Sequence, residues 1–458
     1  MATPPEKLLE YFTAMDAAGA VIIKDTPKLD LETYMQNYNG RTRFDRLMLI
    51  GQCSVVLCID ALKAAVAEAK RGKDVARYRE AVDLLRQAAP NEPEANLDRQ
   101  WIDVTEKSNR EETKRLEQEL KGYKNNLVRE SIRMGNEDLG KHLEETGNLA
   151  DASEAYSRMR PDVSTSKQVA DVGKHLIRVA LQKRDWTAVN SSLNRIAGLQ
   201  SQLSEDLGFP TYIRVMDGLA NLGQERYKEA AAAFLKADHS APASSYADAM
   251  SPNDVAIYGS LLSLATMDRV AIQTNVLDNS SFRSFLELEP HLRRAITQFV
   301  NGRYSSCLEI LESYRSDYLL DMHLQRHVPE LFLQIRSKCI SQYLLPFSCV
   351  TIASLDESFA VDGESIEEEL VTMISNGILD ARINSVDKLV TATAVKPRIQ
   401  MQLAALKAAQ QYETEAAERL RRMNILAAEL EVKNNNKRGM TVADTEWEGS
   451  SSAMASVF

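Results

Sequence analysis

The feature of this sequence that most constrains its fold is a repeat between about residues 140 and 316. Each copy has a polar turn, a large apolar residue, and a small or β-branched residue three positions later. Such a pattern is typical of antiparallel helix pairs that stack as a tetratricopeptide-like solenoid. The sequence therefore predicts a mainly α fold built on a helical-repeat solenoid. The large residues, separated by 37, 41 and 77 positions, are Leu149, Trp186, Tyr227 and Tyr304.

The 77-residue interval corresponds to about two periods, and a weaker copy near Asp268, Arg269 and Val270 falls within it. In the predicted geometry the small residue lets the neighbouring helix approach closely, while the large residue fills the space above it. The alternative is that these segments are only helix starts in an irregular bundle.

Composition supports a helical chain with more than one packed unit. Its 458 residues exceed the size at which a single hydrophobic core stops growing. Only 13 Pro and 19 Gly interrupt it, which favours helices joined by short turns. We expect helix from residue 29, a loop at residues 88–97, and helix again through the charged stretch 106–133.

Charge and hydrophobicity argue against nucleic acid and membranes as partners. The net charge of -10 offers no broad positive field for phosphates. No apolar run reaches the length that crosses a bilayer, and residues 1–24 lack the pattern of a signal peptide. The cysteines are odd in number, scattered, and never spaced as Cys-x-x-Cys, so we expect reduced, buried thiols.

After the repeats, the pattern changes to that of a winged helix. Ser365 and Glu368 are spaced as a capping box, and Gly377 is placed to end the helix that they begin. Helix, helix and hairpin is the order of a winged-helix domain. The elements expected here are a long helix over 319–345 that ends before Pro346, helices over 351–359 and 366–376, and strands over 381–384 and 388–391.

A winged helix raises the question of DNA, because its second helix often enters the major groove. Here that helix carries Glu364, Glu367, Glu368 and Glu369 and has no Lys or Arg between residues 363 and 376. Carboxylates would repel phosphates, so we favour protein binding over DNA binding. The hairpin could offer an unpaired strand edge to a neighbouring sheet.

The last predicted helix runs from Pro397 to about Lys433, with apolar residues near one face. We favour bundling with helices of other subunits over folding back onto its own domain. The expected domains are a peripheral segment (1–27), a helical-repeat arm (28–316), the winged-helix region (317–395), the bundling helix (396–433) and a disordered tail (434–458). The candidate subunit interface comprises Ile383, Leu389, Val390, Ile399, Leu403, Leu406, Tyr412, Leu420, Met423, Leu426 and Leu430.

A search for catalytic chemistry gives no candidate that we adopt. The sequence has no Gly-rich phosphate loop, dinucleotide turn or Gly-x-Ser-x-Gly elbow. His323 and His327, with Asp321 nearby, could face one ion, but position 324, where zincin chemistry needs Glu, is Leu. Asp238, His239 and Ser240 are adjacent in sequence and suit a surface loop. We expect no catalytic, cofactor-binding or metal-binding residues, no cofactor, and no enzymatic activity.

Six segments resemble one known family, the first subunits of the COP-nine signalosome, a complex of PCI-domain and MPN-domain proteins. A related subunit of the proteasome regulatory lid shares this layout. The runs RESIRMG and LLDMHL resemble the signalosome version, and the tail and residues 360–365 depart from it. The segments are YNGRTR (38–43, with Arg46 and Leu47), RESIRMG (129–135), SFRSFLEL (281–288), RYSSCLE (303–309), LLDMHL (319–324) and QYLLPF (342–347).

The resemblance implies a helical-repeat arm joined to a PCI module whose winged helix sits beside those of neighbouring PCI subunits. It implies a scaffold role in a complex of the cytoplasm and nucleus that removes Nedd8 from the cullins of ubiquitin ligases. In that complex the isopeptidase is a different, metal-binding subunit. Other PCI and MPN subunits are thus expected as direct partners, and cullin-based ligases as indirect ones. The alternative is the homologous scaffold subunit of the proteasome lid.

Overall fold

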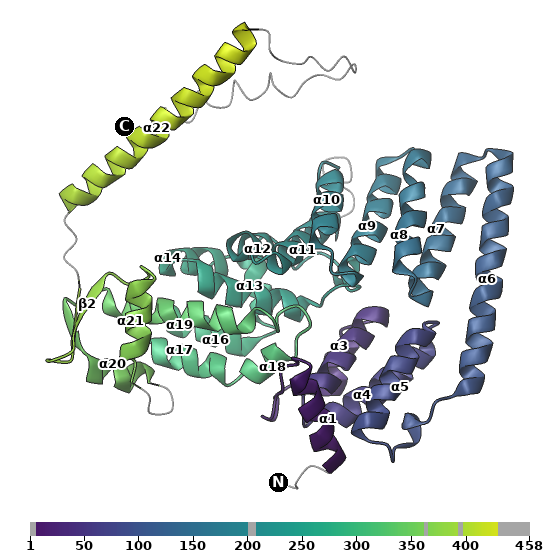
Figure 1. Ribbon diagram of the computed structural model, residues 1–458, viewed down its shortest axis with the longest axis horizontal. Helices are drawn as coiled ribbons and strands as arrows, with labels where there is room; N and C mark the ends of the chain where they lie inside the picture. Colours follow the sequence, from purple (N-terminus) through teal and green to yellow (C-terminus); the bar gives the residue numbers. More distant parts are fainter. Residues whose placement is uncertain (1–5, 200–207, 361–364, 393–396, 429–458) are drawn as a thin grey trace. The chain divides into compact units, whose positions relative to one another are not determined.

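The computed structural model describes residues 6–199, 208–360, 365–392 and 397–428 (Figure 1). The chain divides into a compact unit that ends at Ala392 and a second unit that begins at Thr393. Helices dominate the described residues, and their sheet has three strands. The predicted fold class, a helical-repeat solenoid followed by a winged helix and a long C-terminal helix, is therefore confirmed.

The N-terminal helices form a packed group of their own. Helix α1 buries Leu8, Tyr11 and Phe12, and Ile23 forms a parallel bridge with Ser54. Residues 1–27, expected to be peripheral, therefore include a helix that belongs to a hydrophobic core. The helices of this group are α1 (Glu6–Ala17), α2 (Leu31–Gln36), α3 (Gly40–Cys53), α4 (Cys58–Arg71) and α5 (Val75–Ala88), followed by the short turn η1 (Pro93–Ala95).

The helical arm begins with α6 (Arg99–Asn126), which packs chiefly against α7 (Arg129–Thr146). The charged stretch 106–133, predicted as helix, is thus interrupted between these two helices. The remaining helices of the arm are α8 (Leu149–Arg158), α9 (Ser166–Gln182), α10 (Trp186–Ala197), α11 (Gly208–Gly223), α12 (Tyr227–Phe234), α13 (Pro252–Thr266), α14 (Arg269–Ile272), α15 (Ser280–Leu286), α16 (Pro290–Val300) and α17 (Tyr304–Glu312).

The predicted repeat corresponds to successive helix pairs in this arm (Figure 1). Leu149, Trp186, Tyr227 and Tyr304 are each the first residue of the second helix of a pair. The weaker copy near Val270 falls at the start of α14, where Val270 is 77% exposed and so lacks the packing of the other copies.

The polar turn of each repeat is a left-handed helix stop. One residue at the end of the first helix has a positive φ, and the next N–H bonds to the carbonyl oxygen five residues earlier. This is the Schellman arrangement, which satisfies carbonyl groups that the helix end would leave unpaired. The positive-φ residues are Gly147, Arg184, Glu225 and Gly302, and the bonds are Asn148 to Leu143, Asp185 to Ala180, Arg226 to Asn221 and Arg303 to Gln298.

Close packing follows within the pairs and between them. The residues three positions after the large ones, Ala152, Val189, Ala230 and Cys307, are fully buried. The ring of Trp186 packs over Gly223 of the next helix, where an added Cβ would come within 2.3 Å of it. The sequence-based expectation of small residues at helix contacts thus matches the packing.

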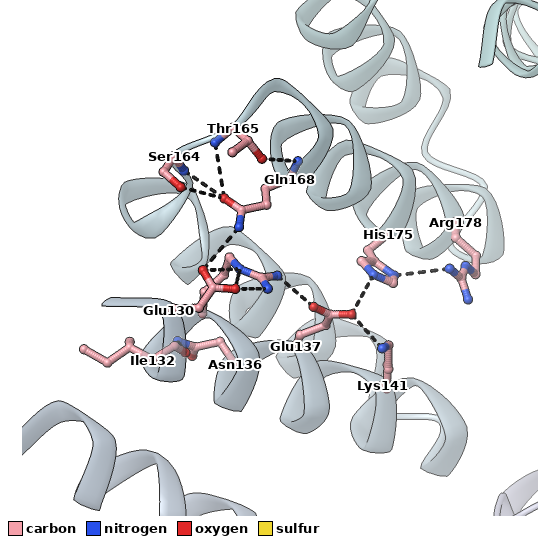
Figure 2. Close-up of polar contacts among 11 residues, drawn as sticks. Glu130, Ile132, Asn136, Glu137, Lys141, Ser164, Thr165, Gln168, His175 and Arg178 are labelled. Carbon is pink, nitrogen blue, oxygen red and sulfur yellow. Dashed lines mark hydrogen bonds and ion pairs between the residues drawn. The ribbon is translucent and has the colours of Figure 1, made fainter. Parts of the chain in front are cut away.

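Polar side chains clamp α7 to α9 (Figure 2). Glu137 accepts hydrogen bonds from Arg133 at 2.9 Å and Lys141 at 2.6 Å, and lies 3.7 Å from Nε2 of His175. Burial and the nearby Arg178 cation lower the pKa of His175 to about 4, so its ring is neutral at pH 7 and stacks on Tyr156. Within the RESIRMG run, Glu130 accepts a hydrogen bond from Gln168 of α9 at 3.2 Å, so the run takes part in this contact between repeats.

The winged-helix region follows the arm. Its elements are α18 (Arg315–Leu319), α19 (Val328–Leu344), β1 (Cys349–Thr351), α20 (Ile352–Phe359), α21 (Glu367–Ser375), β2 (Ala381–Asn384) and β3 (Leu389–Ala392). The prediction of one helix over 319–345 is wrong, because the chain turns between α18 and α19. The Asp321 carboxylate causes the break by accepting hydrogen bonds from the backbone N–H groups of His323 and Leu324.

Two further local predictions differ in outcome. The capping box of Ser365 and Glu368 does not form, because the N-cap is Ile366 and the Ser365 hydroxyl accepts only the Glu367 N–H, at 3.4 Å. The stop at Gly377 is confirmed, since its φ is +71° and the next N–H bonds to Met373.

A buried arginine joins the N-terminal helices to both later parts of this unit. Arg46 on α3 is fully buried and donates to Asp254 on α13 at 2.9 Å and to Asp321 at 2.6 Å. Tyr38 donates to the other oxygen of Asp254 at 2.7 Å, and Tyr258 to that of Asp321 at 2.5 Å. Both carboxylates are thus satisfied by groups from distant segments.

The two carboxyl groups respond differently to this burial. Burial raises the pKa of Asp254, although Arg46 opposes the change. Burial also favours a higher pKa for Asp321. The Arg46 cation and the Tyr258 hydrogen bond outweigh this effect, so the pKa of Asp321 is lowered. Because a depressed pKa stabilises the fold only while the group is ionised, the Asp321 contribution is lost as pH falls through its folded pKa.

None of the helices in the described ranges combines the length and apolar character needed to span a bilayer.

Replacing Arg46 with Met should lower the free energy of unfolding by about 3–5 kcal/mol, because two buried carboxylates then lack their cation. Urea denaturation of the purified chain measures the change. A triple variant that adds Asp254→Asn and Asp321→Asn should recover part of the loss. Arg71→Met, which removes an exposed cation beside Glu68 while Arg43 still pairs with that carboxylate, is the control and should leave the midpoint unchanged. An unchanged midpoint for Arg46→Met would contradict the structural role of this residue.

Replacing either of two helix-interior glycines with Ala should change the free energy of unfolding, but in opposite directions. A Cβ at Gly140 would come within 2.5 Å of the Tyr156 ring, whereas one at Gly122 meets nothing within 4 Å. Gly140→Ala should therefore destabilise the chain by about 1–3 kcal/mol through overpacking. Gly122→Ala should stabilise it by about 0.5–1 kcal/mol through helix propensity. Urea midpoints measured side by side test the pair, and equal shifts would refute the packing of α7 on α8.

Candidate subunit interface

The winged-helix sheet places one candidate strand at an edge. The strand order is β1, β3, β2, and β3 pairs antiparallel with both neighbours. Ile383 of β2 lies opposite Val390 of β3, and Asn384 opposite Leu389. The outer side of β2 has no strand partner among the described residues, so its backbone groups are open to pairing. The short strand β1 was missed by sequence reasoning, since Cys349–Thr351 is too brief to show alternation.

The three hairpin candidates do not have equal access to a partner. Val390 is 2% exposed and belongs to the main hydrophobic core, so its side chain is a core contact and we remove it from the candidate surface. Ile383 packs against that same core, and its side chain remains half-buried. The side chain of Leu389 is also half-buried. Strict alternation along β3 was the signal that could have assigned Val390 to the inner face.

The acidic helix α21 is held by cations of its own domain. Arg336 on α19 pairs with Glu369 at 2.9 Å, and Lys388 in the hairpin pairs with Glu367 at 2.7 Å. Arg336 also donates to the carbonyl oxygen of Phe359, at 2.6 Å, which fixes α20 beside α21. These pairs orient the winged helix on α19.

The second unit contributes helix α22 (Pro397–Ala427). Its candidate side chains are exposed within that unit, from 48% for Ile399 to 74% for Tyr412. Leu430 lies outside the described residues. The other exposed candidates are Leu403, Leu406, Leu420, Met423 and Leu426.

Four of these side chains follow a heptad pattern, whereas Leu403, Tyr412 and Leu426 lie beside it. Ile399, Leu406 and Leu420 fall on one seven-residue series, and Met423 falls on the second series, offset by three. Glu413 occupies a position of the first series at the middle of the helix. Two interleaved series of this kind are the seam of a helical bundle, and a polar residue in the seam fixes its register.

The possible catalytic groups are engaged in structural contacts. Asp321 binds Arg46, His323 packs edge-on against Trp186, and His327 lies 3.3 Å from the Tyr227 hydroxyl. His239 packs against Phe285. Within the ranges that the structure describes, no group of three His, Cys, Asp or Glu side chains could hold a metal ion.

A cavity of about 350 Å³ lies between α3, α5, α9 and α11. Several of its charged lining residues pair with one another, as Arg77 does with Asp45 at 2.8 Å and Arg178 with Asp248 at 3.6 Å. We therefore regard it as a space between packed modules.

Two family models match parts of the chain. Residues 98–275 match the family model of the 26S proteasome subunit RPN7, and residues 311–394 match that of the PCI domain. The second match covers the winged helix described above, and the first covers the arm from α6 into the π-helical turn (Gln273–Leu277) that follows α14.

The full-length similarity is to signalosome subunits. The chain is 51% identical to the COP9 signalosome complex subunit 1 of Neurospora crassa, over 95% of each chain. It is 47% identical to that of Emericella nidulans, over 91% of this chain and 86% of the relative. The 26S proteasome non-ATPase regulatory subunit 6 of Oryza sativa is 23% identical, over 60% of this chain and 70% of the relative. The chain belongs to the COP9 signalosome complex subunit 1 family.

Proposed function

We propose that this chain is a non-catalytic scaffold subunit of the COP9 signalosome. It supports the complex that removes Nedd8 from the cullins of ubiquitin ligases, and it acts in the cytoplasm and nucleus. The observation that carries the proposal is the heptad stripe of exposed apolar side chains on α22. A helix with such a stripe gains stability only when other helices cover it.

The sheet supplies a second surface for assembly. The free side of β2 can extend the sheet of a neighbouring PCI subunit through main-chain hydrogen bonds. Ile383 at this edge and the stripe on α22 are the contacts that we propose for PCI and MPN subunits. Cullin-based ligases are then reached through the assembled complex.

Two observations favour a structural role over catalysis. Asp321, His323 and His327, the best metal candidates in the sequence, make contacts that hold the fold together. Burial lowers the pKa of His323 to about 3, which keeps the ring neutral and removes it from acid catalysis near pH 7.

The proteasome lid is the second candidate function, favoured by the match of residues 98–275 to its subunit family and by the 23% identical proteasome relative. The greater identity and coverage of the signalosome relatives argue for the first candidate. A tagged chain purified from its native cells separates the two, since it should retain signalosome subunits and leave proteasome subunits behind.

Replacing Leu406 and Leu420 together with Asp tests the stripe, because both lie on its first seven-residue series. We expect the fraction of chain that co-purifies with a tagged sister subunit to fall by about tenfold or more, because an apolar seam cannot bury two unpaired carboxylates. Circular dichroism of the purified chain should stay as in the wild type, since both residues are exposed.

The matched control is Gln411→Asp with Thr414→Asp, which adds the same charge to the opposite side of α22 and should keep the chain in the complex. Wild-type retention of the Leu406→Asp, Leu420→Asp variant would count against the proposed seam.

A further inference from the structure

Another cavity, of about 150 Å³, lies in the arm between α9, α10 and the turn η2 (Arg160–Asp162) that follows α8. Figure 1 shows α8, α9 and α10 as successive helices of the arm. An apolar space of this volume holds a group about the size of benzene, so it can take one aliphatic side chain of another molecule. The aliphatic residues that line it are Val163, Val169, Val172, Leu176 and Ile196.

A buried hydroxyl also lines this cavity. Ser192 on α10 is 8% exposed, and its hydroxyl makes no hydrogen bond with any of the described residues. In other helices of the chain, the hydroxyls of Thr297 and Ser341 donate to the carbonyl oxygen four residues earlier. A buried hydroxyl normally has a partner, because an unbonded one costs free energy. The hydroxyl of Ser192 is therefore available to a ligand in the cavity.

Two arginines flank the cavity without a counter-charge. Arg160 on η2 and Arg195 on α10 make no ion pair among the described residues, whereas Arg158, two residues before η2, pairs with Glu154 at 2.6 Å. Partial burial and the charge of Arg195 both lower the pKa of Arg160, and no described carboxylate opposes them. Like charges held this close raise the energy of the folded chain, and an anion beside both would lower it.

We propose that this cavity binds a phosphorylated peptide, with the phosphate held by Arg160 and Arg195 and a neighbouring aliphatic side chain inside the cavity. A phosphorylated side chain carries about −1.5 to −2 charges and three acceptor oxygens, so it matches two guanidinium groups better than one carboxylate does. The Ser192 hydroxyl bonds to the peptide next to the buried aliphatic group. The inference is independent of the proposed function, because the site uses neither α22 nor β2.

Fluorescence anisotropy of the purified full-length chain tests the site. The probe is a short fluorescein-labelled peptide in which leucine residues flank one phosphoserine. Arg160→Gln with Arg195→Gln should weaken its binding about tenfold or more, because the phosphate loses both cations. Ser192→Ala should weaken it about threefold through the loss of one hydrogen bond. The same peptide without the phosphate should bind the wild-type chain about tenfold more weakly.

Arg293→Gln with Arg294→Gln is the matched control. It removes two exposed arginines of α16 that likewise make no ion pair among the described residues, so the affinity should stay as in the wild type. An unchanged affinity of the Arg160→Gln, Arg195→Gln variant, or no binding by the wild-type chain, would overturn the proposal. A peptide with glutamate in place of phosphoserine that binds as tightly would also overturn it, since the site would then recognise a single carboxylate. Equally tight binding of inorganic phosphate would make a free anion the ligand instead.

Urea denaturation separates this role from a structural one. Because the two cations repel each other, the Arg160→Gln, Arg195→Gln variant should unfold at or above the wild-type midpoint. A midpoint clearly below that of the Arg293→Gln, Arg294→Gln control would show that the fold itself needs these arginines, and the proposal would then fail.

Discussion

The contact between Arg46 and the two aspartates Asp254 and Asp321 determines how the first unit holds together. It brings α3, α13 and the turn before α19 to one point, although these segments lie far apart in the sequence. Burying an arginine is strongly unfavourable unless its charge is matched, and here two carboxylates match it, although the Nε–H of Arg46 has no hydrogen-bond partner among the described residues. Tyr38 and Tyr258 complete the arrangement by donating to the remaining carboxylate oxygens. The N-terminal helices are thus fixed to the arm and to the base of the winged helix.

Although this buried contact holds the first unit together, the chain leaves apolar side chains exposed in a few defined places. The repeat pairs bury their small residues against one another, and their turns end in left-handed residues that suit solvent. The stripe on α22 and the edge of β2 lack such compensation within the chain. Binding energy in protein assemblies concentrates in surfaces of this kind, which fits a subunit that contributes geometry to a complex.

The sequence predicted local features well where a periodic signal was present. Leu149, Trp186, Tyr227 and Tyr304 marked the helix starts, because a solenoid repeats its contacts at a fixed interval. Features set by distant residues were not predictable. The helix expected over 319–345 breaks because the Asp321 side chain bonds to its own backbone, and the role of Arg46 depends on residues more than two hundred positions away. Val390 was misplaced for a related reason, since burial of one strand face depends on the helices packed against it.

The Arg46 contact also has a consequence for how the chain is made. The two aspartates follow Arg46 by 208 and 275 residues, and Leu320 contributes to the same hydrophobic core as the N-terminal helices. During translation the first helices therefore emerge long before their permanent neighbours exist. Domains commonly fold in the order in which the ribosome releases them. In this unit, however, the N-terminal helices can reach their final packing only after the region around Asp321 has been synthesised. The nascent N-terminal segment must stay soluble, or be held by a chaperone, until the winged helix begins to appear.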